Sequence, residues 1–201
     1  WLDEHKDAEI NIDGYQIYRS DCSIKRRNRG RDRGGVALYL RNDLACDAET
    51  LLKYSNGAVE VLAVHVKQIK SVIIVVYRHP DDPNGRVRST VNELCPALDE
   101  IRNTLAKLKT PFPQVVMCGD FNLPNANWDA PCIPQQARSD EQKMVEKVKE
   151  LTDEYFLFQL ISGPTQRSGN TLDLCFCNNP ALLYDYKAIT TIHSDHRILE
   201  C

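Results

Sequence analysis

The sequence contains no run of about 18 or more apolar residues, no Asn-x-Ser/Thr acceptor and no Cys-x-x-Cys pair. A membrane-spanning helix and N-glycosylation therefore have no support, and the eight scattered cysteines suggest a reduced interior rather than a zinc framework. We predict an intracellular protein, nuclear or cytoplasmic, with no membrane partner. The chain begins with Trp1 rather than Met, so we expect further residues, and any leader among them, upstream in the complete protein.

The sequence also lacks a strong charge of one sign, because its formal net charge is only −3. This balance does not by itself suggest a nucleic-acid-binding protein, but a local patch can still bind phosphate. One dense basic run lies at residues 25–33, where Asp32 is the only acid. Phosphate contact is one interpretation of this run, and a solvated loop or a localisation signal is an equal alternative. The candidate phosphate-binding residues are Arg26, Arg27, Arg29, Arg31 and Arg33.

No linker or repeat divides the chain, so its 201 residues are predicted to form one domain with a substantial core. Apolar runs favour strands at residues 15–19, 36–40, 59–66 and 72–77, the last two forming a hairpin. Apolar residues at three- and four-residue steps predict two core-facing helices. Capping-box patterns open them at Thr90 and Ser139, and the second apolar stripe runs to Phe158.

Gly119-Asp120-Phe121-Asn122 follows the apolar run 115–118 and is the most informative segment of the chain. Side chains alternate along a strand, so an acid and a carboxamide two residues apart point to one face. A buried strand that ends in this way is typical of a site. Asp120 alone is more often a turn or cap residue.

A second acid, Asp173, lies near the start of the apolar strand 172–176. Because an acid in such a run costs free energy unless it is paired, a histidine partner is expected. His196, in Ser194-Asp195-His196, is the candidate. Tyr77 ends another apolar strand, where a lone tyrosine usually serves in packing.

Four ordered motifs connect these residues: Tyr77-Arg78-His79-Pro80; Gly119-Asp120-Phe121-Asn122 with Trp128; Pro164-Thr165 with Asn170-x-Leu172-Asp173; and Ser194-Asp195-His196. Together they resemble the endonuclease/exonuclease/phosphatase superfamily. Trp1-Leu2, Gly34-Gly35-Val36-Ala37 and Asn178-Asn179-Pro180 narrow the resemblance to the apurinic-site-endonuclease-like domain of non-LTR retrotransposons. The resemblance implies an α/β (α+β) fold, a DNase I-like four-layer α/β/β/α sandwich of two mostly antiparallel sheets, with the active site at one sheet edge.

The resemblance also implies roles for these residues in phosphodiester cleavage. Asp120 would orient or deprotonate the attacking water beside Asn122, and His196, held by Asp173, would face the phosphate with Tyr77. Asp195 would be a metal ligand, with Mg2+ or Mn2+ as the expected cofactor. DNA would be the substrate, contacted by the basic run, Arg167 and Asn170, and a reverse transcriptase would be fused to the domain.

The chain departs from the superfamily pattern at its ends. An Asn on the first strand and a metal-binding Glu would both precede Trp1, so we expect a single domain over 1–201 that lacks its first strand or strands and the end of its last. Three hypotheses follow: a DNA endonuclease for retrotransposition, impaired in this chain; a non-catalytic nucleic-acid-binding remnant; and a superfamily phosphatase or exonuclease.

Overall fold

The structure, a computed structural model, describes residues 7–22, 35–80, 90–109, 113–128, 139–182, 187–191 and 194–200. The basic run at 25–33 lies outside these residues. The described elements are η1 (Asp7–Glu9), β1 (Tyr15–Asp21), β2 (Gly35–Arg41), α1 (Asn42–Ala45), β3 (Ala48–Ser55), β4 (Val59–Val66), η2 (Lys67–Ile69), β5 (Ser71–Arg78), α2 (Val91–Ala106), β6 (Gln114–Asp120), α3 (Ser139–Glu154), β7 (Phe158–Gln159), β8 (Asp173–Cys177), η3 (Pro180–Leu182), β9 (Lys187–Ile189) and β10 (Ile198–Glu200).

A six-stranded sheet in the order β3-β4-β5-β6-β8-β7 forms the centre of the molecule. Its neighbouring strands are antiparallel except for β5 and β6, which run parallel and are connected through α2. Two further antiparallel pairs, β1 with β2 and β9 with β10, complete the described strands. The predicted hairpin of β4 and β5 is confirmed, as are the strands predicted at residues 15–19 and 36–40.

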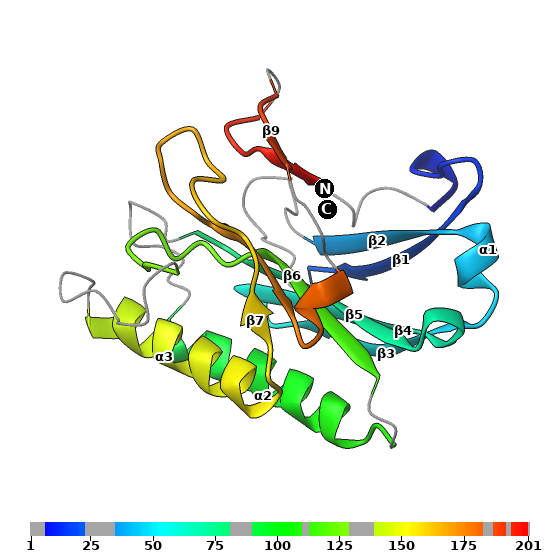
Figure 1. Cartoon of the computed structure of the whole chain (residues 1–201), viewed down its shortest axis with the longest axis horizontal. Helices are drawn as coiled ribbons and strands as arrows, with labels where there is room; N and C mark the ends of the chain where they lie inside the picture. Colours follow the sequence, from blue (N-terminus) through cyan, green and yellow to red (C-terminus); the bar gives the residue numbers. More distant parts are fainter. Residues whose placement is uncertain are drawn as a thin grey trace.

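The two faces of this sheet are covered differently (Figure 1). Helices α2 and α3 lie side by side across one face, and the β1–β2 pair lies over the other. The alternation of side chains along β4 shows the division, since Val59, Val61 and Ala63 pack with the helices while Leu62, Val64 and Val66 pack with the β1–β2 pair. Strand β4 is apolar on both faces because the helices cover one face of the sheet and the β1–β2 pair covers the other.

Helix α2 begins as the sequence predicts. The Thr90 side chain accepts from the Asn92 amide at 3.2 Å, and the Thr90 amide donates to Glu93 Oε2 at 2.7 Å, completing a capping box. The prediction for the second helix was wrong at its end. Helix α3 stops at Glu154, Phe156 has φ 54°, and Phe158 is 55% exposed in β7 instead of extending the buried stripe.

The predicted fold class is confirmed: the chain is a mixed α/β domain of mostly antiparallel strands around a six-stranded sheet. In the part of the chain that the structure describes, no helix is long and apolar enough to cross a membrane.

Candidate active site

Strand β6 ends at Asp120, at one end of the sheet, and Gly119 allows β5 and β6 to pair closely just before it. Gly119 has φ +144°, and a Cβ there would lie 1.8 Å from the carbonyl oxygen of Val76 on β5. Only glycine permits β5 and β6 to pair so closely at this point. Glycine is therefore required at position 119 because the backbones of β5 and β6 are in close contact there.

The register of the sheet places four polar side chains in one row. Asp120 is the parallel partner of Tyr77 and the antiparallel partner of Asp173, and Tyr77 is in turn the partner of Glu60. Directly opposed residues on neighbouring strands point to the same face. Because Tyr77 packs with the β1–β2 side of the core, the row faces that side of the sheet.

Asn122 holds Asp120 in place. Its backbone amide donates to Asp120 Oδ1 at 3.0 Å, and its Nδ2 donates to Asp120 Oδ2 at 2.9 Å and to the Arg78 carbonyl at 2.7 Å. The Arg78 guanidinium returns a hydrogen bond of 2.7 Å to the Asn122 carbonyl. Asn122 adopts φ 48°, a conformation that asparagine tolerates better than most residues. Arg78 had no role predicted from the sequence, yet it is 1% exposed and anchors this turn.

His196 approaches from the C-terminal segment. Its Nδ1 lies 2.9 Å from Asp173 Oδ2, and its Nε2 lies 3.9 Å from Asp120 Oδ2. Asp120, Asp173 and His196 together offer ligand atoms within 4.8 Å of one another. The structure therefore joins the two strand ends that the sequence analysis paired.

A buried threonine positions both His196 and Asp173. Thr165 accepts through Oγ1 from the amides of Leu172 and Asp173 at 2.9 and 3.0 Å, and its carbonyl accepts from the Arg197 amide at 2.8 Å. The chain on either side of His196 is thus fixed to the segment that begins β8. Thr165 belongs to the Pro164-Thr165 motif, but the sequence gave no sign of this anchoring role.

Burial and neighbouring charges shift the pKa values of Asp120 and His196. Burial, followed by the negative charge of Asp173, raises the pKa of Asp120 to about 6, although His196 and Asn122 oppose the shift. Burial alone would lower the pKa of His196, but its hydrogen bond to Asp173 and the charges of Asp173, Asp120 and Asp195 raise it above its ordinary value. Perturbed groups that share a partly open edge are typical of functional sites.

Tyr77 lies beside this cluster, and burial raises the pKa of its phenol, followed by the charges of Asp120, Glu60 and Cys22. Its ring stands 4.8 Å from that of His79. Trp128, which follows Asn122 in the same motif, packs edge-on against Phe176, and the two ring centroids are 6.0 Å apart.

The remaining site candidates lie near the cluster but outside it. Asp195 is adjacent to His196, and its Oδ2 accepts from Gln166 Nε2 at 2.9 Å, which lowers its pKa. Arg167 is exposed, and its amide donates to the Asp195 carbonyl at 2.9 Å. Asn170 Nδ2 donates to Ser168 Oγ at 3.2 Å. The five arginines of the basic run lie outside the described residues.

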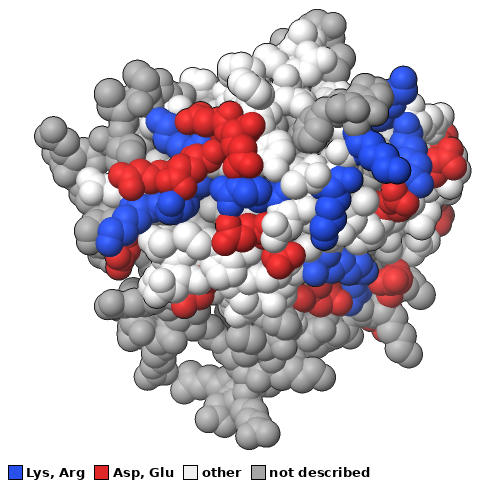
Figure 2. Space-filling view, turned by 90° about the horizontal axis from the view of Figure 1, so that it is seen from below, with Lys and Arg blue, Asp and Glu red and all other residues white. Residues whose placement is uncertain are grey.

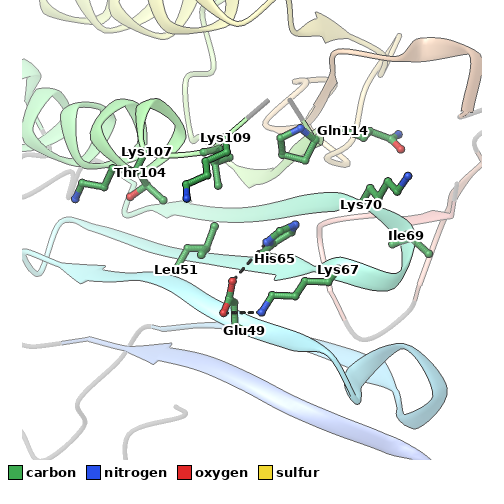
Figure 3. A pocket seen from close by; sticks show the side chains of 12 residues that line it. Glu49, Leu51, His65, Lys67, Ile69, Lys70, Thr104, Lys107, Lys109 and Gln114 are labelled. Carbon is green, nitrogen blue, oxygen red and sulfur yellow. Dashed lines mark hydrogen bonds and ion pairs between the residues drawn. The ribbon is translucent and has the colours of Figure 1, made fainter. Parts of the chain in front are cut away.

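A cavity of about 840 Å³ lies at the opposite end of the strands (Figure 3). Gln114 and Lys70, at the starts of β6 and β5, line it, whereas Asp120 ends β6 six residues later, about 20 Å along the strand. Glu49 on its wall bonds Lys67 at 3.0 Å and lies 3.5 Å from His65 Nδ1. The cavity is therefore separate from the acidic cluster.

The face seen from below the helices carries interleaved charges of both signs (Figure 2). Arg102 pairs with Asp99 at 2.6 Å and with Glu154 at 2.7 Å, and Lys147 pairs with Glu150 at 2.6 Å. Alternating charges that neutralise one another do not form a continuous basic surface for a nucleic-acid backbone. The visible helical face thus gives no support to a DNA contact there.

Comparison with solved structures shows which proteins share this fold. The endonuclease domain of TRAS1, a telomere-specific non-LTR retrotransposon, matches 94% of this chain and 77% of its own length, with 17% identity and a TM-score of 0.55. The AP endonuclease LMAP from Leishmania major matches 96% and 72%, with 14% identity and a TM-score of 0.58. The human Nocturnin catalytic domain matches 92% and 70%, with 16% identity and a TM-score of 0.54. These proteins share the fold of the endonuclease/exonuclease/phosphatase superfamily.

The family follows from the sequence match. Residues 71–200 match the family model described as endonuclease-reverse transcriptase, and this match covers more than half of the chain. The chain therefore belongs to the endonuclease-reverse transcriptase family, within a superfamily of nucleases and phosphatases. A search of curated proteins gave no match.

Proposed function

We propose that this chain is the metal-dependent endonuclease domain of a retrotransposon protein and nicks target DNA. The observation that carries the proposal is the meeting of Asp120, Asp173 and His196 at one sheet edge, in a chain of the endonuclease-reverse transcriptase family. A reverse transcriptase in the same polypeptide, and action inside the cell where target DNA lies, belong to this proposal.

Asp120 has the properties of the group that orients or deprotonates the attacking water. Its pKa of about 6 leaves it ionised at neutral pH while keeping it basic enough to accept a proton. The two hydrogen bonds from Asn122 fix the direction of its carboxylate. Since Nδ2 of Asn122 already donates to Asp120 and Arg78, we assign Asn122 chiefly to positioning.

His196 has the properties of a phosphate-facing donor. An ionised Asp173 only accepts, so His196 Nδ1 carries a proton toward it, and Nε2 is left on the side of Asp120. The raised pKa of His196 favours the imidazolium, which can donate from Nε2 to a phosphoryl oxygen. The raised pKa of Tyr77 keeps its phenol protonated, so it can serve as a second donor.

The donor set also fits a hard divalent cation. Burial and the charge of Asp173 disfavour the ionised form of Asp120, and a cation beside these carboxylates would relieve that cost. We propose that Asp195 holds Mg2+ or Mn2+ beside the acidic cluster of Asp120 and Asp173. When bound, the ion would neutralise charge on the phosphoryl oxygens and lower the pKa of its water.

The loop that adjoins His196 is the proposed DNA contact. Gln166 forms an antiparallel bridge with His196, so Arg167 and Asn170 lie beside the cluster on one exposed segment. A guanidinium there can pair with backbone phosphate. The five arginines of the basic run are proposed to contribute further phosphate contacts.

A plasmid-nicking assay with Mg2+ tests the proposal on the full-length protein that carries this chain. Asp120→Asn and His196→Ala are expected to lower the nicking rate by about 100-fold or more, because each removes a proton-handling or phosphate-facing group. Lys147→Ala, which removes an ion pair on the helical face, is the matched control and should nick normally.

The outcomes separate the three hypotheses. Wild-type nicking that persists in both Asp120→Asn and His196→Ala contradicts the proposed site. DNA binding without Mg2+-dependent nicking indicates a non-catalytic binding module. Hydrolysis of RNA or phosphoinositides in preference to duplex DNA indicates a superfamily phosphatase or exonuclease.

A further inference from the structure

A second cluster of metal-binding side chains lies farther along the same sheet face. Cys22 follows β1, Glu60 is the second residue of β4, and His79 follows β5. Their ligand atoms all lie within 4.8 Å of one another. Cys22 comes from the β1–β2 layer and the other two from the six-stranded sheet, so the cluster lies where the two layers meet. The sequence analysis had given none of these residues a role.

Glu60 is the unusual member of the cluster. Its side chain is 0% exposed, and a buried carboxylate costs free energy unless a partner neutralises it. Oε1 lies 3.2 Å from His79 Nε2 and accepts from Ser55 Oγ at 3.4 Å. Oε2 lies 3.0 Å from the same nitrogen but receives no well-formed hydrogen bond within the described part of the chain. One carboxylate oxygen is therefore buried and aimed into the cluster without a donor of its own.

The spacing of the three ligand atoms suits a tetrahedral metal ion. Bonds of about 2.0 Å to nitrogen or oxygen and about 2.3 Å to sulfur place neighbouring ligand atoms roughly 3.3 to 3.6 Å apart. The Glu60–His79 separation of 3.0 Å is close to this value, and the upper limit of 4.8 Å for all pairs exceeds it by only about 1.5 Å. Rotation of side chains is sufficient to close such a gap.

The chemistry of the ligands selects the ion. A thiolate, an imidazole and a carboxylate form a borderline-soft set that suits Zn2+ and is poorly suited to Mg2+, which prefers oxygen. The backbone supports the site, since the His79 amide donates to the Ala58 carbonyl at 2.9 Å. The acidic cluster of Asp120, Asp173 and His196 contains no thiol, so the two clusters differ in the ion they favour.

We propose that Cys22, Glu60 and His79 form a zinc site that links the end of β1 to β4 and β5. Three protein ligands leave one coordination position for water. The ion neutralises the buried Glu60 carboxylate and fixes the β1–β2 layer to the sheet beside Tyr77. This site is independent of the proposed nuclease activity.

Metal titration of the reduced, metal-free protein tests the proposal. Co2+ serves as a spectroscopic probe for Zn2+, since thiolate coordination gives a charge-transfer band that oxygen and nitrogen ligands do not give. We expect one equivalent of Co2+ to produce this band and one equivalent of Zn2+ to remove it. Cys22→Ser should abolish the band, and His79→Asn should weaken Zn2+ affinity at least tenfold.

Two control variants make the result decisive. Cys46→Ser removes an exposed cysteine and should leave the band and the affinity unchanged. Asp173→Asn alters the acidic cluster and should also leave both unchanged. A band that survives in Cys22→Ser, or no thiolate band in the wild type, overturns the proposal. Both substitutions in the cluster are near isosteres, so the test does not depend on a Glu60 variant that could fail to fold.

Discussion

Two of the histidine–carboxylate pairs in the described part of the chain differ in burial more than in chemistry. At the sheet edge, His196 and Asp173 are 2.9 Å apart with side chains 28% and 21% exposed. Across the same sheet, His79 and Glu60 are 3.0 Å apart with side chains 15% and 0% exposed. The first pair is open to solvent and the second is enclosed.

One cross-strand row connects the two pairs. Glu60, Tyr77, Asp120 and Asp173 are successive register partners on β4, β5, β6 and β8. Toward β4 the row lies under the β1–β2 layer, and toward β8 it ends at Asp173, outside the part of β8 that pairs with β7. A carboxylate under the layer needs a permanent counter-charge, whereas a carboxylate at the edge can exchange protons and partners. We therefore expect the closed end of the row, at Glu60 and His79, to serve stability. We expect the open end, at Asp173 and His196, to serve chemistry.

The largest expected effect comes from Gly119→Ala, which breaks the row itself. The new Cβ would lie 1.8 Å from the backbone oxygen of Val76, and relief of that contact separates β5 from β6. We expect a loss of more than about 4 kcal/mol, so that no folded protein remains by circular dichroism. Gly169→Ala is the control, with φ +94° but no atom within 4 Å of the new Cβ, and should cost only about 1–2 kcal/mol. Equal losses in both variants would show that the close approach is unimportant.

Asp120→Asn should change the pH dependence of stability at the open end. The pKa of Asp120 rises from 3.8 to about 6 on folding, so the wild type loses up to about 3 kcal/mol as pH rises through that window. Below about pH 3 the folded and unfolded forms are both protonated and no difference arises. The variant lacks this titration, and it carries only a constant loss of about 1 kcal/mol for one hydrogen bond from Asn122.

Urea denaturation between pH 4 and 7 measures this difference. The free energy of unfolding of Asp120→Asn, relative to the wild type, should increase with pH and level off above pH 6. Parallel curves for the two proteins would show that Asp120 carries no unfavourable charge in the folded state.

Glu60→Gln and Asp173→Asn should separate the two ends in opposite directions. Removal of the buried Glu60 charge leaves His79 without a charged partner and should cost about 2–3 kcal/mol, while Asp173→Asn should cost about 1 kcal/mol or less. Nicking should change in the opposite order: the rate should fall by about 10- to 100-fold in Asp173→Asn and by less than about tenfold in folded Glu60→Gln. The free energy of unfolding and the nicking rate should be measured on the same preparations of both variants. Equal effects in the two variants would show that the two ends of the row do not differ in role.

Tyr77→Phe should have the smallest effect, and it tests which end Tyr77 serves. The phenol lies between the two clusters, so its loss should change stability by less than about 1 kcal/mol and lower nicking by about tenfold. Tyr54→Phe, which removes another partly buried phenol, is the control and should nick normally. A stability loss without an effect on nicking would assign Tyr77 to the closed end.

Local signals predicted those parts of the fold that depend on neighbours in the sequence. The capping box at Thr90 and the apolar runs of β4 and β5 need only short-range patterns, and the structure has them where they were predicted. The prediction that Phe158 belongs to the second helix was wrong because the apolar spacing continues past the residue where the helix ends. The spacing does not indicate that Phe156 adopts a φ of 54°. The left-handed conformation of Phe156 ends the helix before the apolar spacing ends.

Local patterns were also insufficient to predict every partner in the two histidine–carboxylate clusters. Asp173 was given a histidine partner because an acid in an apolar strand requires one, and the structure places His196 there. Glu60 interrupts the run from Val59 to Val66 in the same way, but its partner depends on which residues lie opposite it. No pattern along the chain specifies that register.

The sequence by itself determined the start of α2, the strands β1, β2, β4 and β5 and the types of residue at the strand ends, because propensity, capping and alternation are local. Only the tertiary structure decided which acids share a row, since strand pairing fixes the neighbours of each side chain. It also decided which end of the row is open, because the β1–β2 layer excludes water from Glu60 while His196 and Asp173 remain at the edge. Burial, rather than residue type, therefore distinguishes the two histidine–carboxylate pairs.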